Sequence, residues 1–171
     1  MNGIGGRSLE IMQDNLTYLV EKYSSTILRV AYTYLKNKAD AEDTVQDVFI
    51  KIMDKSPVFE NEAAQKAWII KTTVNMCKNK LNLFWNRNKT SLDEIAEIGK
   101  EDTYNTDSEV LKAVLALPEK YRIVIYMYYY EGYTAVQTAK ILGKSDSTVR
   151  TLLMRAKEKL KITLKEEYDF E

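Results

Sequence analysis

The chain has 171 residues, of which 45% are hydrophobic and 29% charged, a composition typical of a globular protein. It has 25 basic and 25 acidic residues, no histidine and one cysteine, Cys77, which excludes an internal disulfide. Without histidine, the usual zinc sites and histidine-based acid–base catalysis are excluded. The sequence also contains neither a phosphate-cradling glycine loop nor a recognisable metal constellation, so an enzyme is the least expected class of protein and no cofactor is expected.

The length allows one domain or two small ones. No apolar run approaches the roughly 20 residues of a membrane span, and the N-terminus shows no secretory signal. The expectation is a soluble, cytoplasmic protein without membrane insertion.

Helical spacing of apolar residues begins near Leu9 and predicts a first helix to Leu35, with a break near Ser24-Ser25 and a loose end at residues 1–7. Asp40 is the predicted N-cap of a second helix. The outward face of that helix is mostly acidic and consists of Glu42, Asp43, Gln46, Asp47 and Ile50. Such a face is usually only solvated surface. The aliphatic Ile50 among the acidic residues keeps a second interpretation, a protein-binding surface, as an alternative.

A loop that carries Phe59 precedes the third predicted helix, which Asn61 caps and which spans about Glu62 to Leu83. Trp68 is expected to anchor the core. The other polar positions combine cations and amides: Lys66, Lys71, Asn75, Lys78, Asn79 and Lys80. Cations, amides and a nearby aromatic are what a single-stranded nucleic acid channel needs, and the alternative is that the lysines only keep the surface soluble.

Helical periodicity is lost from Leu83 to Asn105, which predicts an acidic linker with a brief turn around residues 92–98. Periodicity resumes at Asp107-Ser108, and Pro118 fits the first turn of a further helix. The run from Ile123 to Tyr130 is apolar almost all round and is expected to be core. The fold class is therefore all-α, with two small helical domains at residues 8–84 and 108–166 and a linker at 85–107.

Residues 134–161 predict two helices joined by a tight turn, a helix-turn-helix. Thr134 and Gln137 suit a capping box, Gly143 suits the end of the first helix, and Ser145 can cap the second. The second helix is expected to bury Val149, Leu152, Leu153, Ala156 and Leu160 and to expose Ser147, Arg150, Thr151, Met154 and Arg155. The start of such a helix enters the major groove of DNA. The alternative is an amphipathic hairpin with solvated lysines.

Charge is distributed as nucleic-acid binding requires, although the net charge is zero. Residues 61–90 and 132–165 are predominantly basic, and residues 91–110 between them are predominantly acidic.

Four motifs in order resemble the extracytoplasmic-function group of bacterial sigma factors over about residues 9–165. They are Asp40-Ala41-Glu42-Asp43 with Gln46 and Phe49; Phe59 with Trp68-Ile69 and Asn75; Leu117-Pro118 with Arg122 and then Glu131-Gly132; and Thr148-Val149-Arg150 with Arg155-Ala156. Two positions depart from the family pattern. Gln137-Thr138-Ala139 stands where Glu-Ile-Ala is common, and Asn79 stands where an aspartate is common.

The resemblance implies a sigma factor that binds RNA polymerase core and directs promoter-specific transcription initiation. Its implied partners are promoter DNA and the core enzyme, through the clamp helices of the β′ subunit and the flap of the β subunit. The residues that it assigns to core binding are Asp43, Gln46, Asp47 and Ile50. Those assigned to the opened −10 element are Phe59, Asn61, Lys66, Lys71, Asn75, Lys78 and Asn79. Those assigned to the −35 element are Ser145, Ser147, Thr148, Arg150, Thr151 and Arg155.

Two other classes of protein remain open from the residues themselves. A stand-alone helix-turn-helix regulator would use only the last third of the chain, and a helical adaptor would need no DNA. At the −10 site, the alternative is that Asn75 satisfies a local backbone group and Phe59 plugs the end of the core. The sequence leaves open whether an anti-sigma factor holds the protein.

Overall fold

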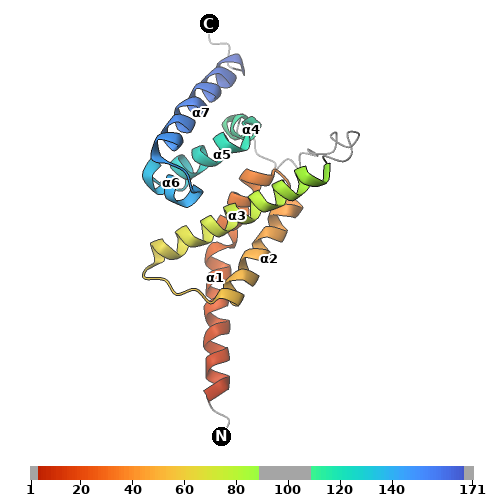
Figure 1. Ribbon diagram of the computed structural model, residues 1–171, viewed down its shortest axis with the longest axis vertical. Coiled ribbons are helices and arrows are strands. Elements are labelled where there is room, and N and C mark those ends of the chain that lie inside the picture. The colour runs from red at the N-terminus through yellow and green to blue at the C-terminus, as the bar shows by residue number, and fades with distance from the viewer. Residues whose placement is uncertain (1–3, 89–108, 168–171) are drawn as a thin grey trace.

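The computed structural model describes the backbone of residues 4–88 and 109–167 and the side chains of residues 15–87 and 109–165 (Figure 1). Every regular element in these ranges is a helix. Three helices form the N-terminal group: α1 (Ile4–Leu35), α2 (Lys38–Lys55) and α3 (Glu62–Asn88). The C-terminal group contains α4 (Glu109–Ala116), α5 (Glu119–Ile125), the π-helix η2 (Tyr126–Tyr130), α6 (Ala135–Leu142) and α7 (Asp146–Glu167). The predicted all-α fold class is therefore confirmed.

The first helix differs from its prediction at two places. It begins at Ile4, so most of the expected loose end is helical, and it runs through Ser24-Ser25 without a break. The two serines are tolerated because their hydroxyls have partners inside the helix. Ser24 donates to the Val20 carbonyl at 2.5 Å, and Ser25 accepts from Arg29 at 2.8 Å.

The start of α2 corrects a second prediction. Asn37 is the N-cap instead of Asp40, and its side-chain oxygen accepts from the Asp40 backbone N–H at 2.9 Å. Asp40 lies in the first turn, where its charge favours the positive end of the helix dipole. The predicted cap of α3 is present, since Asn61 accepts from the Ala64 N–H at 2.8 Å.

The third helix is longer than the sequence predicted. It continues to Asn88, past the end expected at Leu83, so the residues at 83–88 are helical. The rest of the predicted linker, including the turn at 92–98, lies outside the described residues. Figure 1 shows the last turns of α3 extending past α2.

The helix-turn-helix forms as the local signals predict. Thr134 and Gln137 make both bonds of a capping box, and Gly143 ends α6 in the left-handed conformation at φ 64°. The Ser145 hydroxyl accepts from the Thr148 N–H at 3.2 Å at the start of α7. Pro118 is the N-cap of α5 and lies one residue before its expected place in the first turn.

The aromatic run Tyr126–Tyr130 corrects a further prediction. Met127 is buried, but Tyr128, Tyr129 and Tyr130 are 40%, 58% and 64% exposed. The π-helical geometry accounts for this, because the bond from the Glu131 N–H to the Tyr126 carbonyl widens the turn and brings consecutive tyrosines to the surface.

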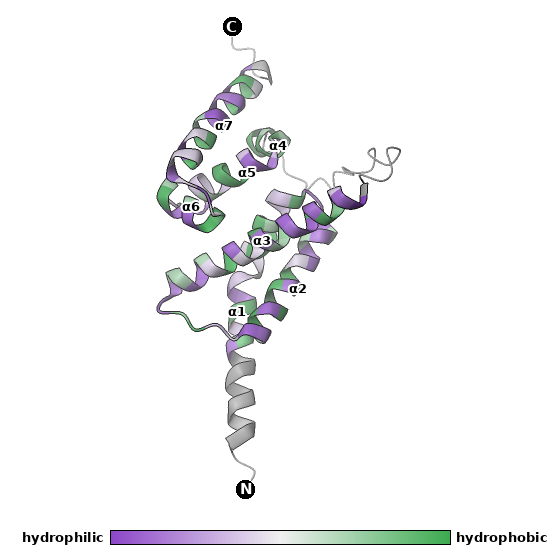
Figure 2. Cartoon of the chain, viewed as in Figure 1, coloured by the Kyte–Doolittle hydropathy of each residue, from purple (hydrophilic) through white to green (hydrophobic). Residues whose placement is uncertain are grey.

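The two groups of helices share one apolar core. The larger buried cluster joins Val30 and Tyr34 of α1 and Ile70 and Val74 of α3 to residues of α5, α6 and α7. A smaller cluster fills the space between α1, α2 and α3. Figure 2 shows hydrophilic and hydrophobic residues interspersed along α2, α3 and α7, as amphipathic helices require.

Candidate nucleic-acid and polymerase interfaces

One exposed face of α3 gathers most of the residues predicted to bind the −10 element. Lys71, Asn75, Lys78 and Asn79 recur at three- and four-residue spacing, so they share one side of the helix. Lys71, Asn75 and Asn79 are exposed and Lys78 is partly buried, whereas Val74 and Cys77 on the other side are buried. This face therefore presents one exposed cation, Lys71, one partly buried cation, Lys78, and two exposed amides.

Phe59 lies at the start of this face. Its ring meets Trp68 edge to face, with ring centroids 5.6 Å apart and planes at 62°. Phe59 also lines a cavity of about 800 Å³ whose walls come from α1, the end of α2, the loop at residues 56–59 and Gln65 of α3. Asn75 is seven residues after Trp68, which is two helical turns and about 10 Å along the same side of α3.

Two predicted −10 residues are placed differently. The Lys66 ammonium lies 2.7 Å from the Glu131 carboxylate in the C-terminal group. Lys66 precedes Asn75 by nine residues, which is half a turn away from the shared face. Asn61 is exposed, but its side-chain oxygen is occupied as the N-cap of α3. The structure therefore places Lys71, Asn75, Lys78 and Asn79 on one side of α3, with Phe59 against Trp68 two helical turns before Asn75. Lys66 and Asn61 are engaged in other contacts.

Lys78 reaches the C-terminal group at the end of α6. Its ammonium donates to the Leu142 carbonyl at 3.3 Å, where the negative end of the helix dipole favours a cation. Partial burial, followed by the positive charge of Lys144, lowers the pKa of Lys78.

The residues predicted to read the −35 element surround the start of α7. Ser145, Ser147, Thr148, Arg150 and Arg155 are exposed and Thr151 is half-buried. Val149, Leu153 and Ala156 on the opposite side are buried in the shared core, which fixes the rotation of α7 about its axis. The Ser145 hydroxyl is within 2.8 Å of the Thr148 hydroxyl, and Thr151 donates to the Ser147 carbonyl at 2.9 Å. Arg150 makes no such local bond in the described part of the chain, so its guanidinium is available to a ligand.

The face of α2 predicted to bind polymerase is outward. Asp43, Gln46 and Ile50 are exposed, with Ile50 at 50%, and Asp47 is half-buried. Asp47 pairs with Lys80 of α3 at 3.1 Å. Asp47 and Ile50 line a groove of about 500 Å³ that Met76, Lys80 and Leu83 of α3 complete.

The α3 side of this groove was missed by sequence reasoning. The sequence pattern places Lys80 among the nucleic-acid residues and predicts that the helix ends at Leu83. The helical period of α3 could have predicted this side of the groove. Met76, Lys80 and Leu83 recur at spacings of four and three residues, so they form a stripe that faces α2.

A buried arginine joins the two groups of helices. Arg122 of α5 donates from Nε to the Thr33 carbonyl at 2.6 Å and from Nη2 to the Tyr34 carbonyl at 3.0 Å, both in the last turn of α1. Its Nη1 donates to the Leu117 carbonyl at 2.5 Å. The last carbonyls of a helix have no partner within it, so Arg122 caps α1 from the other group. Arg122 is only 6% exposed, and burial lowers its pKa.

A second polar contact between the groups centres on Glu131. The Tyr126 hydroxyl donates to the Glu131 carboxylate at 2.7 Å, and Lys66 pairs with its other oxygen. Burial and this hydrogen bond raise the pKa of Tyr126. The Lys66–Glu131 ion pair and the Arg122 hydrogen bonds hold the C-terminal helices against α3 and α1, and the Tyr126 hydrogen bond orients the Glu131 carboxylate within its own group.

Within the described ranges, no helix is long and apolar enough to cross a membrane. The same ranges contain no group of three or more acidic, cysteine or histidine side chains arranged to hold a metal ion.

Comparison with known proteins identifies both halves of the chain. Sigma-70 region 2 matches residues 19–83, and Sigma-70, region 4 matches residues 107–160. The RNA polymerase sigma factor SigV of Bacillus subtilis is 27% identical over 159 residues, which cover 89% of this chain and 92% of SigV. The ECF RNA polymerase sigma factor SigW of the same organism is 24% identical over 170 residues, covering 90% and 91% of the two chains.

Two solved structures share the fold. The sigma factor RpoE in complex with the anti-sigma factor NepR from Bartonella quintana has a TM-score of 0.70 at 21% identity, covering 88% of this chain and 97% of that chain. CnrH in complex with the cytosolic domain of CnrY has a TM-score of 0.62 at 19% identity, covering 90% of each chain. With both sigma-70 regions present in order, the chain belongs to the extracytoplasmic-function group of RNA polymerase sigma factors, which direct the polymerase to promoters.

Proposed function

We propose that two domains, at residues 8–88 and 108–166 and joined by residues 89–107, carry separate functions; the first domain ends with α3 at Asn88, later than the sequence predicts. The N-terminal domain binds polymerase core through the α2 face and the opened −10 element through the α3 face. The C-terminal domain reads the −35 element as duplex DNA through α7. This protein supplies recognition and strand opening and leaves the chemistry of RNA synthesis to the polymerase.

The observation that carries this proposal is the outward face of α7. Burial of Val149, Leu153 and Ala156 forces Ser147 and Arg150 to the surface within the first two turns, which is the part of a recognition helix that enters the major groove. An arginine there suits guanine, whose O6 and N7 accept two hydrogen bonds from one guanidinium. The exposed Lys157, Lys159 and Lys161 further along α7 suit phosphate contacts.

The proposed −10 site consists of Phe59 and the exposed face of α3. Extruding a base from the duplex costs a few kcal/mol, and stacking on an aromatic ring returns about 1–3 kcal/mol. The Phe59 ring, held against Trp68, supplies the stacking surface. Asn75 supplies a donor and an acceptor for the base edge, and Lys71 and Lys78 supply charge for the phosphates.

Polymerase core binds, in our proposal, along the groove between α2 and α3. Ile50 and Leu83 provide exposed apolar surface, and Asp43 and Asp47 provide charge that the clamp helices of the β′ subunit would match. The flap of the β subunit would contact the C-terminal domain. Binding that depends on such exposed charges weakens as salt rises.

The promoter geometry requires the domains to separate. Elements centred at −10 and −35 are roughly 25 base pairs apart, which is about 85 Å of straight duplex at 3.4 Å per pair. In the docked arrangement the −10 surface on α3 lies next to the −35 surface at the start of α7. Lys78 of α3 donates to the Leu142 carbonyl, and Leu142 is only three residues before Ser145. Residues 89–108 could reach about 70 Å when fully extended, and the domains that they join span the remaining roughly 15 Å by their own width, so the covalent connection permits separation.

An anti-sigma factor is a further proposed partner, because the RpoE structure above was determined with the anti-sigma factor NepR bound. Affinity purification of the full chain from its host, followed by mass spectrometry, tests this partner.

The proposed function is tested by a mobility-shift experiment on a promoter fragment with and without polymerase core. We expect a specific complex that requires core and is lost when the −10 element is replaced. Specific binding without core would indicate a stand-alone regulator, and the absence of DNA binding in either case would indicate an adaptor.

A further inference from the structure

The outward face of α3 does not end with the residues already assigned to the −10 element. Asn75, Asn79, Asn82 and Asn86 recur at spacings of four, three and four residues. At 100° per residue they lie within about 60° of one another around the helix. All four side chains are exposed, so α3 carries an asparagine stripe, defined by these four residues, that is about 16 Å long.

The stripe conflicts with local preference, which argues for a function. Asparagine is an unfavourable helix residue, because its amide competes with the backbone for hydrogen bonds. A solvated helix face is normally filled with lysine, glutamate, glutamine or alanine. In the described part of the chain none of the four amides has a hydrogen-bond partner, so no structural bond explains them. Residues that break local rules without a structural gain are expected at functional positions.

The residues beside the asparagine stripe have the chemistry that binds a nucleic acid strand. Lys71 and Lys78 lie on one side of it, and after Glu62 in its first turn α3 contains no acidic residue. Trp85 follows Lys78 by seven residues, so it lies on the same flank, and its side chain is 53% exposed. Cations for phosphates, amides for base edges and an exposed indole for stacking occur together on one surface.

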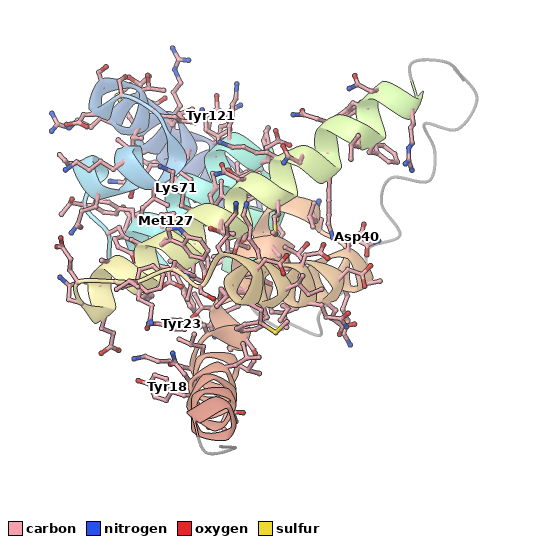
Figure 3. All side chains as sticks on the ribbon, turned by 60° about the horizontal axis from the view of Figure 1, so that its bottom comes forward. Tyr18, Tyr23, Asp40, Lys71, Tyr121 and Met127 are labelled. Atoms are coloured by element: carbon pink, nitrogen blue, oxygen red, sulfur yellow. The ribbon has the colours of Figure 1, made fainter. Side chains whose placement is uncertain are left out.

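The end of α3 is accessible to such a ligand. Figure 3, in agreement with Figure 1, shows its last turns running clear of the other helices. A strand stacked at 3.4 Å per nucleotide would pass about five nucleotides along 16 Å of helix.

We propose that the asparagine stripe and Trp85 form a second unpaired-DNA site, which continues the −10 site along α3 and takes several nucleotides beyond the base held at Phe59 and Asn75. The site rests on the proposed −10 function, which it lengthens. Asn82 and Asn86 read base edges, with adenine favoured because its N6 and N7 match an amide. Trp85 stacks on a base without regard to its identity.

The test uses holoenzyme assembled from polymerase core and the full chain, with single-stranded oligonucleotides of the non-template strand. A short oligonucleotide carries only the −10 element, and longer ones add five nucleotides at either end. Extension at one end is expected to tighten binding at least fivefold, as one stacked base does. Asn82→Ala and Trp85→Ala should lose this gain while binding the short oligonucleotide normally.

Phe84→Leu provides the control, since Phe84 is the neighbouring aromatic residue, about 100° from Trp85 around the helix. Its ring meets Trp85 edge to face with centroids 6.1 Å apart, and leucine keeps an apolar side chain beside the indole. It should keep the gain. The proposal is overturned if extension at neither end tightens binding, or if the gain survives in the Asn82→Ala, Trp85→Ala double variant. A Trp85→Ala variant that loses core affinity but keeps the gain would identify a polymerase contact instead. Failure of wild-type holoenzyme to bind the short oligonucleotide would overturn the −10 assignment itself, and this site with it.

Discussion

Replacing Arg122 by methionine should loosen the docked domains and destabilise the protein. Methionine keeps much of the aliphatic length and removes the three donors. Two of the three hydrogen bonds cross from α5 to the Thr33 and Tyr34 carbonyls of α1. Lys36, in the left-handed conformation, ends α1 with a bond to Tyr32, so Thr33 and Tyr34 would be left without partners.

The magnitude follows from these bonds. A hydrogen bond to a charged group contributes about 1.5–3 kcal/mol to stability. Arg122 is buried, and removing its guanidinium from water costs free energy, so we take the lower end of that range for each bond. The two bonds across the interface then contribute about 3 kcal/mol, equivalent to about a 150-fold change in the equilibrium between docked and separated domains. A buried charge can sometimes be replaced by an apolar residue without loss, but here the neutral carbonyls stay behind unpaired.

The assay combines urea unfolding followed by circular dichroism with small-angle X-ray scattering. Arg122→Met should lose about 3 kcal/mol of unfolding free energy and show a larger radius of gyration. Arg155→Met is the matched control, because Arg155 is exposed on α7, and it should change neither quantity. An Arg122→Met protein as stable and as compact as wild type would refute the role given to this arginine.

Four other predictions test separate parts of the structure. The Gln46→Ala, Asp47→Ala double variant should bind core several-fold more weakly with an unchanged circular dichroism spectrum, and unaltered affinity in a core titration would remove the α2 face from the interface. Arg150→Ala, measured on a panel of −35 variants, should lose about 1–3 kcal/mol at one base pair if it reads a base, or weaken all sequences alike if it contacts phosphate; wild-type binding throughout would contradict both. Asn75→Ala should keep its melting temperature and show a smaller transcription defect on a template pre-opened at −10 than on duplex, whereas equal defects with lost stability would make Asn75 structural. Cys77 is fully buried and burial raises its thiol pKa to about 12, so a thiol reagent at pH 8 should modify it only on unfolding, and rapid labelling of the native protein would contradict that burial.

The features that sequence reasoning predicted correctly depend on neighbours in the chain. The capping box at Thr134, the left-handed Gly143 and the cap at Asn61 each involve residues three or four positions apart. The buried stripe of α7 follows in the same way from the helical period. Predictions failed where two local signals compete. Asn37 and Asp40 are both good caps, and in the structure the backbone is extended at Asn37, with φ −130° and ψ 123°, and helical from Lys38, so Asn37 is the cap.

The long-range features could not be predicted from spacing. Arg122 is 89 positions from Thr33, and its bonds depend on how the two groups of helices dock. The end of α3 was predicted too early because Leu83, Phe84 and Trp85 point to different sides of the helix and hide the apolar period. The exposure of Tyr128 to Tyr130 depends on a π-helical turn, for which the sequence has no distinctive pattern.

The central claim is that this chain directs RNA polymerase core to promoters through two separate elements. The most direct measurement is in vitro transcription of a genomic library with core enzyme and the purified chain, with sequencing of the start sites. We expect start sites that require the chain and share two upstream motifs near −10 and −35, with Arg150→Ala altering use of the second motif. Start sites identical to those of core alone, or sharing no motif near −10, would contradict it.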